Sequence, residues 1–307
     1  MTTDWLTAGL PPPAYEALAR GLPASRLWSL LLGVMEARAA VRTLPALMDQ
    51  WARDRFVQPA YIDQRTMLEV DRHLLGAASE FEALELSPVA PLGVCSAMGR
   101  TSQHKVLSAL RGTEVVSDPT NILALECASR LRRDRATVVR LTTSHRSVRA
   151  QEIPKVRGFA AHFRMFCLAS AGIEQPDHAF VVDALAAHIK VMLAALDRLE
   201  QHGFAFPERH VTVLASDDRA PIGDRIAAAV GRPDVSRALL EHRYYGGLRY
   251  QIAARSTEGT NLPLIDGGAF DWVAKLTSNR RAVYVASGLG SQLVPLLFRA
   301  TSEPPGQ

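Results

Sequence analysis

The order of the strand-like and helical segments constrains the fold of this chain more than any other feature. Strand-like segments gather in three regions, 81–94, 138–169 and 248–287, and helical segments lie between them. A regular parallel α/β fold would instead alternate strands and helices along the whole chain. We therefore predict an α+β fold in which an antiparallel β-sheet is flanked by helices.

Helical periodicity extends the prediction beyond the strand-like regions. Residues 14–40 read as two helices, and 44–54 as a third with its apolar residues on one face. Phe56–Ile62 reads as extended. The apolar stripe of Phe180–Gln201 predicts the clearest helix, and Asp218–Leu240 reads as a helix with one interruption.

Composition is that of an ordinary globular protein, with 48% hydrophobic and 21% charged residues among 307. We expect one domain over 1–307, made of an N-terminal helical portion (1–55) and a core (56–307). No uninterrupted apolar run reaches the roughly 20 residues of a membrane span. For that reason we expect no membrane partner. The three cysteines are widely spaced and suggest no disulfide framework, so we expect a cytoplasmic protein.

Positive charge is concentrated in one part of the chain. The net charge is +4, yet residues 130–164 hold ten Lys and Arg against two acids. A basic segment of this kind attracts phosphate, either on a nucleotide or on a nucleic acid. The alternative is a solvated helix end and loop. Aromatic residues are few there, so stacking of single-stranded nucleic acid is not favoured.

Four residues within 114–172 are candidate binding residues. Asp118 and Thr120 stand at a helix start, where a carboxylate and a hydroxyl could hold an ammonium group or simply cap the helix. Arg149 follows a strand and could hold a phosphate or lie on the surface. Phe163 could stack on a purine or belong to the core. These alternatives stay open at the level of single residues.

Other candidate motifs are weaker. His145 and His162 could act as a base or as ligands, but structural hydrogen bonding is the simpler interpretation, and no set of residues has metal-ligand spacing. The glycine-rich segments 244–248, 266–268 and 287–291 let backbone approach a ligand. They match neither a Walker loop nor a dinucleotide fingerprint, and no serine-hydrolase elbow is found.

Taken in order, the segments resemble the catalytic core of class II aminoacyl-tRNA synthetases. The resemblance is strongest to the histidyl-tRNA synthetase branch, which includes the non-charging regulatory subunit of ATP phosphoribosyltransferase. Residues 44–62 are similar to the first class motif. VVSDPT (115–120) resembles the turn that holds the substrate amine. VRLTTSHRSVRAQ (139–151) with AHFRMF (161–166) resembles the second motif.

Three C-terminal segments complete the resemblance. YYGGLRYQI (244–252), IDGGAFD (265–271) and VASGLGSQL (285–293) resemble the substrate-specificity loop, the GGRYD-like turn and the third motif. The resemblance implies a class II synthetase catalytic-domain fold, a homodimer and ATP, with Mg, as a possible ligand. It implies amino-acid-binding roles for Asp118, Thr120 and Tyr250 and nucleotide-binding roles for Arg149 and Phe163.

The chain departs from the family pattern where charge is needed for adenylate formation. The departures are Gln151 for an acid, Gly246, Ala269 and Leu293 for arginines, and Met165 and Ala169 for amine-binding residues. Losing one preorganised cationic donor costs a few kcal/mol in a transition state. The residues near enough in sequence to compensate are Arg243, Arg249, Arg280 and Arg281.

These departures favour a synthetase paralogue that does not charge tRNA in the ordinary way. It would bind an amino acid, a nucleotide or both as a ligand-sensing or regulatory subunit, with a protein partner possible. No C-terminal anticodon-binding domain is expected after the third motif. The alternative is an ATP-dependent ligase that activates a carboxylic or amino acid for a carrier, peptide or small molecule, so enzyme activity stays open. A weaker alternative is an RNA-binding module, with tRNA as a possible partner.

Overall fold

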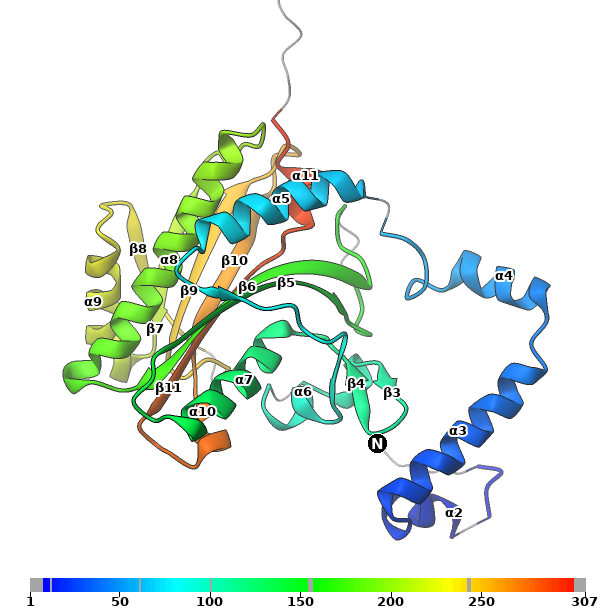
Figure 1. The fold of residues 1–307 in the computed structure, drawn as a ribbon. Coiled ribbons are helices and arrows are strands. Elements are labelled where there is room, and N and C mark those ends of the chain that lie inside the picture. The colour runs from blue at the N-terminus through cyan, green and yellow to red at the C-terminus, as the bar shows by residue number, and fades with distance from the viewer. Residues whose placement is uncertain are drawn as a thin grey trace, which may run out of the picture.

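The computed structural model describes residues 8–11, 13–60, 62–99, 101–153, 157–241 and 244–300. A large sheet forms the centre of the molecule, and helices pack on both of its faces (Figure 1). The strands of this sheet are β1 (Glu82–Ala83), β5 (Val139–Val148), β6 (His162–Ile173), β7 (His210–Ala215), β8 (Val235–Leu239), β9 (Leu248–Arg255), β10 (Asn261–Phe270) and β11 (Ala282–Leu289). The predicted α+β fold is therefore confirmed.

The strand order is β1-β5-β6-β11-β10-β9-β7-β8. Every pair from β5 to β7 in that order is antiparallel, whereas β1 and β8 pair in parallel with the strands beside them. The β5–β6 hairpin keeps one register from Val139↔Ala171 to Val148↔His162. This long hairpin ends beside the candidate site, so its register fixes the positions of Arg149 and Phe163 relative to each other.

The two faces of the sheet are covered by different helices. One face packs against α5 (Gln64–Ala77), α8 (Ala179–Glu200) and α9 (Ala220–Val230), and the other against α7 (Pro119–Arg133) and α10 (Trp272–Thr277). The segment Pro176–Glu200 around α8 is long and apolar enough to cross a membrane, but 61% of its apolar window is buried inside the fold. That burial is typical of a core helix.

A second, smaller sheet lies beside α7. It joins β2 (Val89–Pro91), β4 (Thr113–Val115) and β3 (Ser108–Ala109) in antiparallel order. The short helical segments nearby are α6 (Val94–Ala97) and η2 (Gln103–Lys105). Because β4 runs almost directly into α7, the small sheet positions the start of that helix.

The N-terminal helices extend away from the sheet (Figure 1). They are α2 (Ala14–Glu16), the π-helical turn η1 (Ala17–Gly21), α3 (Ala24–Ala40) and α4 (Leu44–Arg53). None of their described residues is buried. Thr43 caps α4 and Pro45 occupies its first turn. The remaining helical segments are η3 (Pro176–His178), η4 (Asp217–Arg219) and α11 (Leu293–Leu297).

Three predicted elements differ from the structure. Phe56–Ile62, expected to be extended, forms turns and bends in its described residues, and Tyr61 lies outside them. The strand expected within 81–94 is divided between two short strands of different sheets. The second half of the helix expected at 218–240 is instead β8, because pairing with β7 outweighs the local helical pattern.

Candidate functional site

Two adjoining cavities open on the α7 face of the sheet, and together they form the cleft. The first encloses about 360 Å³ and the second about 270 Å³. Both are lined by Arg149, Gln151, Met165, Asp266 and Gly288. These shared residues form a junction, so a ligand that reaches from one cavity into the other must pass Arg149 and Asp266.

The start of α7 forms one wall of the first cavity. Asp118 is the N-cap residue, and its Oδ1 accepts hydrogen bonds from Thr120 N at 3.0 Å and Thr120 Oγ1 at 2.7 Å. Pro119 at the first helical position suits this start. The Tyr284 hydroxyl donates to Thr120 O at 2.6 Å and ties the turn to the sheet. The cap therefore holds a carboxylate at the cavity wall with Oδ2 open to further donors.

Arg149 lies at the junction, directly after β5. Its Nε donates to Ser117 O at 2.9 Å, and one terminal nitrogen is 3.4 Å from Asp118 Oδ2. Its guanidinium also lies over the Phe163 ring, 5.0 Å from the ring centre. Phe163 lines the second cavity, whereas Asp118 and Thr120 line the first. The structure thus brings these four predicted residues to one cleft.

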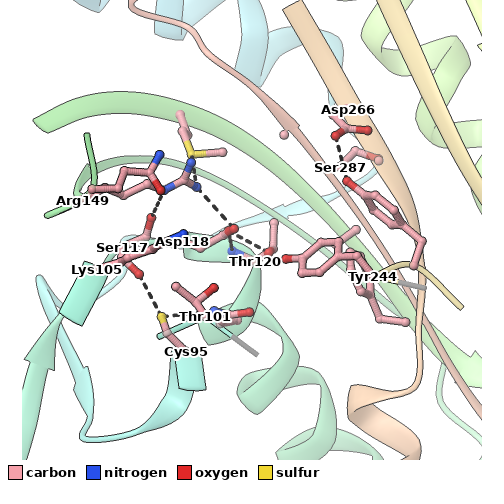
Figure 2. Close-up of a pocket in the computed structure, with 18 residues that line it drawn as sticks. Cys95, Thr101, Lys105, Ser117, Asp118, Thr120, Arg149, Tyr244, Asp266 and Ser287 are labelled. Carbon is pink, nitrogen blue, oxygen red and sulfur yellow. Dashed lines mark hydrogen bonds and ion pairs between the residues drawn. The ribbon is translucent and has the colours of Figure 1, made fainter. Parts of the chain in front are cut away.

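Asp266 on β10 stands across the cleft from Asp118 and Arg149 (Figure 2). Its carboxylate accepts two hydrogen bonds from Arg249, each 2.9 Å long, and one from the Tyr245 hydroxyl at 2.8 Å. This bidentate pairing fixes both the carboxylate and the arginine. The positive charge of Arg249 therefore neutralises the negative charge of Asp266 on this wall.

Aromatic rings close one end of the first cavity. Tyr244 lies edge-on against Tyr245 and Phe270, and its hydroxyl end points toward the start of α7 in Figure 2. Burial raises the pKa of Tyr244, and the charge of Asp118 adds to the effect. The phenol therefore stays protonated at neutral pH and can donate a hydrogen bond into the cavity.

The remaining wall holds a buried polar cluster. Cys95 Sγ lies 2.9 Å from Ser117 Oγ and 3.3 Å from the side-chain nitrogen of Asn121. Burial raises the pKa of Cys95, so the thiol stays neutral. The Asn121 side-chain oxygen is buried and has no hydrogen-bond partner within the described part of the chain. A ligand that donates a hydrogen bond here would satisfy it.

The charges along the cleft are balanced. Among its described lining residues the bases are Lys105, Arg149 and Arg164, and the acids are Asp118, Glu152 and Asp266. Arg164 is also paired with Asp71 on α5. Such a lining suits a zwitterion and offers little excess charge for a triphosphate. The apolar part of the second cavity, including Phe159, Phe163 and Leu264, suits an uncharged ring system.

Some residues considered at the sequence level lie elsewhere. Tyr250 does not line either cavity: its side chain is 1% exposed and belongs to the core on the α8 face. His145 is buried, and burial lowers its pKa. His162 contacts Gln58 O and Arg146 instead of the cleft. No group of three or more His, Cys, Asp or Glu side chains suited to a metal occurs among the described residues.

The proposed compensating arginines are also dispersed. Arg249 is engaged by Asp266, and Arg281 bonds Glu174 O at the opposite end of β11 from the cleft. Arg280 precedes the same end, and Arg243 lies outside the described residues. Leu293, at the position of a family arginine, lines the second cavity.

Sequence reasoning did not single out several cleft residues. Lys105, Asn121, Tyr244 and Asp266 all line the first cavity. Tyr244 and Asp266 were visible only as members of glycine-rich segments, and nothing in the local pattern around Lys105 indicated a ligand site.

Comparison with solved structures identifies the architecture. No protein-family model and no curated protein matches the sequence. An ATP phosphoribosyltransferase regulatory subunit/histidyl-tRNA synthetase from Bacillus halodurans superposes with a TM-score of 0.58 at 14% identity, over 77% of this chain and 79% of that one. A histidine–tRNA ligase subunit from Alicyclobacillus acidocaldarius gives 0.56 at 14% identity, over 77% and 94%.

The apo histidyl-tRNA synthetase of S. aureus is similar as well. It gives a TM-score of 0.55 at 10% identity, over 76% of this chain and 65% of that one. At these identities the likeness concerns the fold. The chain has a class II aminoacyl-tRNA synthetase-like fold, with neighbours among histidyl-tRNA synthetases and the regulatory subunit, so the resemblance seen in the sequence is confirmed.

Proposed function

We propose that this protein is a class II synthetase-like paralogue that binds an amino acid in the first cavity and acts as a ligand-sensing or regulatory subunit. One observation carries the proposal. The cleft keeps a carboxylate, a hydroxyl and an arginine around a cavity of about 360 Å³, while its described lining has no net positive charge. Such a cleft can hold a zwitterion without driving phosphoryl chemistry.

The first cavity matches the two ends of an amino acid. Asp118 Oδ2 and the lone pairs of Thr120 Oγ1 can accept from an ammonium group, because the Thr120 proton is already given to Asp118. Arg149 lies beside them and can pair with the carboxylate of the same ligand. The unpartnered Asn121 oxygen offers a further acceptor.

The second cavity supports a nucleoside better than a triphosphate. Phe163 and its apolar neighbours suit a base, and Arg149 can contact one phosphate. The family arginine positions hold Gly246, Ala269 and Leu293, and Arg249 is engaged by Asp266. ATP, with Mg, therefore remains a proposed ligand, and its outer phosphates would meet little cationic support from the described residues.

A protein partner is part of the proposal. The Bacillus halodurans neighbour carries the name of a regulatory subunit, and we extend that kind of role to this chain. The N-terminal helices expose Leu44, Met48 and Trp51, which is consistent with association into a homodimer or with another protein. A cytoplasmic location follows from the same proposal.

Pyrophosphate exchange with ATP tests the proposal against the ligase alternative. We expect no exchange with any of the standard amino acids, together with thermal stabilisation by at least one of them. Exchange with any single amino acid would defeat the regulatory function and establish the ligase. Failure of every amino acid to stabilise the protein would defeat the first cavity as an amino-acid site.

The RNA-binding alternative has weaker support from the fold. Arg130, Arg140 and Arg164 of the basic segment pair with acids from other elements. Arg132 and Arg133 remain exposed at the end of α7. Salt-dependent binding of tRNA that is weakened by Arg132→Ala or Arg133→Ala would support this alternative.

A further inference from the structure

We propose a second ligand site, for the phosphate group of a small phosphorylated molecule, between Arg146 and Arg164 on the α5 face of the sheet. This site is separate from the first cavity and does not depend on the proposed function. Two guanidinium groups lie on the same face of the sheet there, and both line one cavity.

The two arginines face each other across the β5–β6 hairpin. Arg146 and Arg164 are directly opposite residues in the antiparallel register. Directly opposite residues of antiparallel strands have their side chains on the same face, and like charges in such a pair destabilise the sheet. Both side chains are partly buried, so water screens the repulsion incompletely. An anion between them would remove this cost.

Among the described acids, one carboxylate forms an ion pair with one of these two arginines. Asp71 on α5, which is 6% exposed, pairs with Arg164 and also accepts a hydrogen bond from Ser144 Oγ. The Arg164 Nε is buried and has no partner within the described residues. Arg146, the other positive charge of the pair, therefore has no ion-pair partner among the described acids.

The described contacts of Arg146 are with neutral groups. One of its nitrogens lies 3.0 Å from His162 Nδ1 and 3.3 Å from the side-chain oxygen of Gln292. His162 Nε2 lies 2.6 Å from Gln58 O, a carbonyl that can only accept, so Nε2 carries the hydrogen. The Nδ1 lone pair then accepts from Arg146, and the imidazole is neutral. Burial and the nearby Arg164 lower the pKa of Arg146.

These groups open into a cavity of about 410 Å³. Arg146 and Arg164 supply its charged wall together with the neutral His162, while Pro59, Met67 and Leu68 contribute apolar surface. No acid is among its described lining residues. Asp63, which caps α5 nearby, is already engaged by Thr66 N and Thr66 Oγ1. Two guanidinium groups can hold a phosphate through several charge-assisted hydrogen bonds, and the apolar wall can receive an organic portion.

The site also has a physical connection to the cleft. Arg164 and Gln292 line the second cavity, and Gln292 contacts Arg146. A phosphate bound between the arginines would therefore contact side chains that also border the nucleoside cavity. This places the proposed ligand where it can influence that cavity through Arg164 and Gln292.

The test compares thermal unfolding in inorganic phosphate, ribose 5-phosphate, acetate and chloride at matched pH and ionic strength. At a phosphate concentration ten times the dissociation constant, we expect a rise of about 2 °C over chloride. Arg146→Met should abolish the rise, and Arg146→Lys should retain part of it. Arg140→Met removes a positive charge elsewhere on β5, where Arg140 faces Glu80, and should respond like the parent. Arg149→Met, altered only in the cleft, should also respond like the parent.

Direct titration calorimetry on the parent protein keeps the proposal testable if Arg146→Met fails to fold. Heat of phosphate binding at one site, with Arg146→Lys binding more weakly, would support it. An absence of phosphate binding to the parent would overturn it. Equal stabilisation by acetate would overturn the assignment to phosphate, and loss of the response in Arg149→Met would move the site to the cleft. None of these outcomes bears on amino-acid binding in the first cavity.

Discussion

Asp118→Asn is the sharpest test of the amine-binding role, because it removes charge while keeping the helix cap. Asn and Asp are equally good N-cap residues, and the amide oxygen can still accept from Thr120 N and Thr120 Oγ1. The lost ion pair with Arg149 is 3.4 Å long and joins partly exposed groups, so its removal should cost at most about 1 kcal/mol of folding stability.

The effect on an ammonium ligand should be larger. A hydrogen bond to a charged group contributes about 1.5–3 kcal/mol, against about 1 kcal/mol for a neutral pair. Loss of the charge itself adds to the difference, although Arg149 already offsets part of it. We expect a loss of about 2 kcal/mol, equal to about a 30-fold rise in Kd.

The assay is titration calorimetry with the amino acid that stabilises the parent most, alongside its α-hydroxy analogue. The matched control is Asp63→Asn, because Asp63 caps α5 in the same way, with 2.8 Å bonds from Thr66 N and Thr66 Oγ1. The parent and this control should prefer the amine, and Asp118→Asn should lose most of that preference. Equal binding of amino acid by Asp118→Asn and the parent would refute the reasoning, as would equal binding of the hydroxy analogue by the parent.

Three further changes test other parts of the molecule. Arg149→Ala should abolish any stabilisation by ATP in thermal unfolding; undiminished stabilisation would contradict the nucleotide-site proposal. Gly267→Ala should lower the denaturation midpoint, because the new Cβ would lie 2.4 Å from Ser287 Oγ, whereas Gly33→Ala meets nothing within 4 Å and should not. Burial lowers the pKa of His188 to about 3, so unfolded chains take up a proton that the folded protein refuses below about pH 6.5. The free energy of unfolding should therefore decrease as the pH is lowered from about 6.5 toward 3, by up to about 1.4 kcal/mol per pH unit. In urea unfolding measured across that range, His188→Gln should show a weaker dependence of stability on pH.

Sequence patterns predicted a helix or strand correctly where the local preference of the residues agreed with their tertiary contacts. The α7 start was readable because Asp118 and Pro119 are good cap and first-turn residues. Val235–Leu239 was not readable as a strand. Its apolar residues, Val235, Ala238 and Leu239, lie three and four positions apart, as on one face of a helix. Its strand conformation depends on parallel pairing with β7, which no local pattern encodes.

The residues of the candidate site likewise fall into those that local sequence patterns predicted and those that depend on strand pairing. Asp118, at a helix N-cap, and Arg149, after a strand end, were predicted because the residues around such positions form recognisable patterns. The Asp266–Arg249 pair depends on the register of β9 and β10 and was not predicted. Tyr250 was placed at the site by resemblance alone. It shares strand parity with Leu248 and Ile252, and that alternation already indicates a core-facing side chain.

The contacts of Arg249 determine whether it can replace the arginines that the resemblance implies at Gly246, Ala269 and Leu293. Its two bonds to Asp266 are 2.9 Å long, and its side chain is only 17% exposed. Swinging it toward a bound phosphate would leave Asp266, at the junction of the two cavities, without its bidentate partner and repelling the same phosphate. Arg281 cannot substitute, because it is anchored at the far end of β11. Rotation of Arg249 or Arg281 therefore adds no net positive charge for a phosphate bound in the cleft. For this reason the regulatory proposal rests on the cleft geometry as well as on the altered motifs.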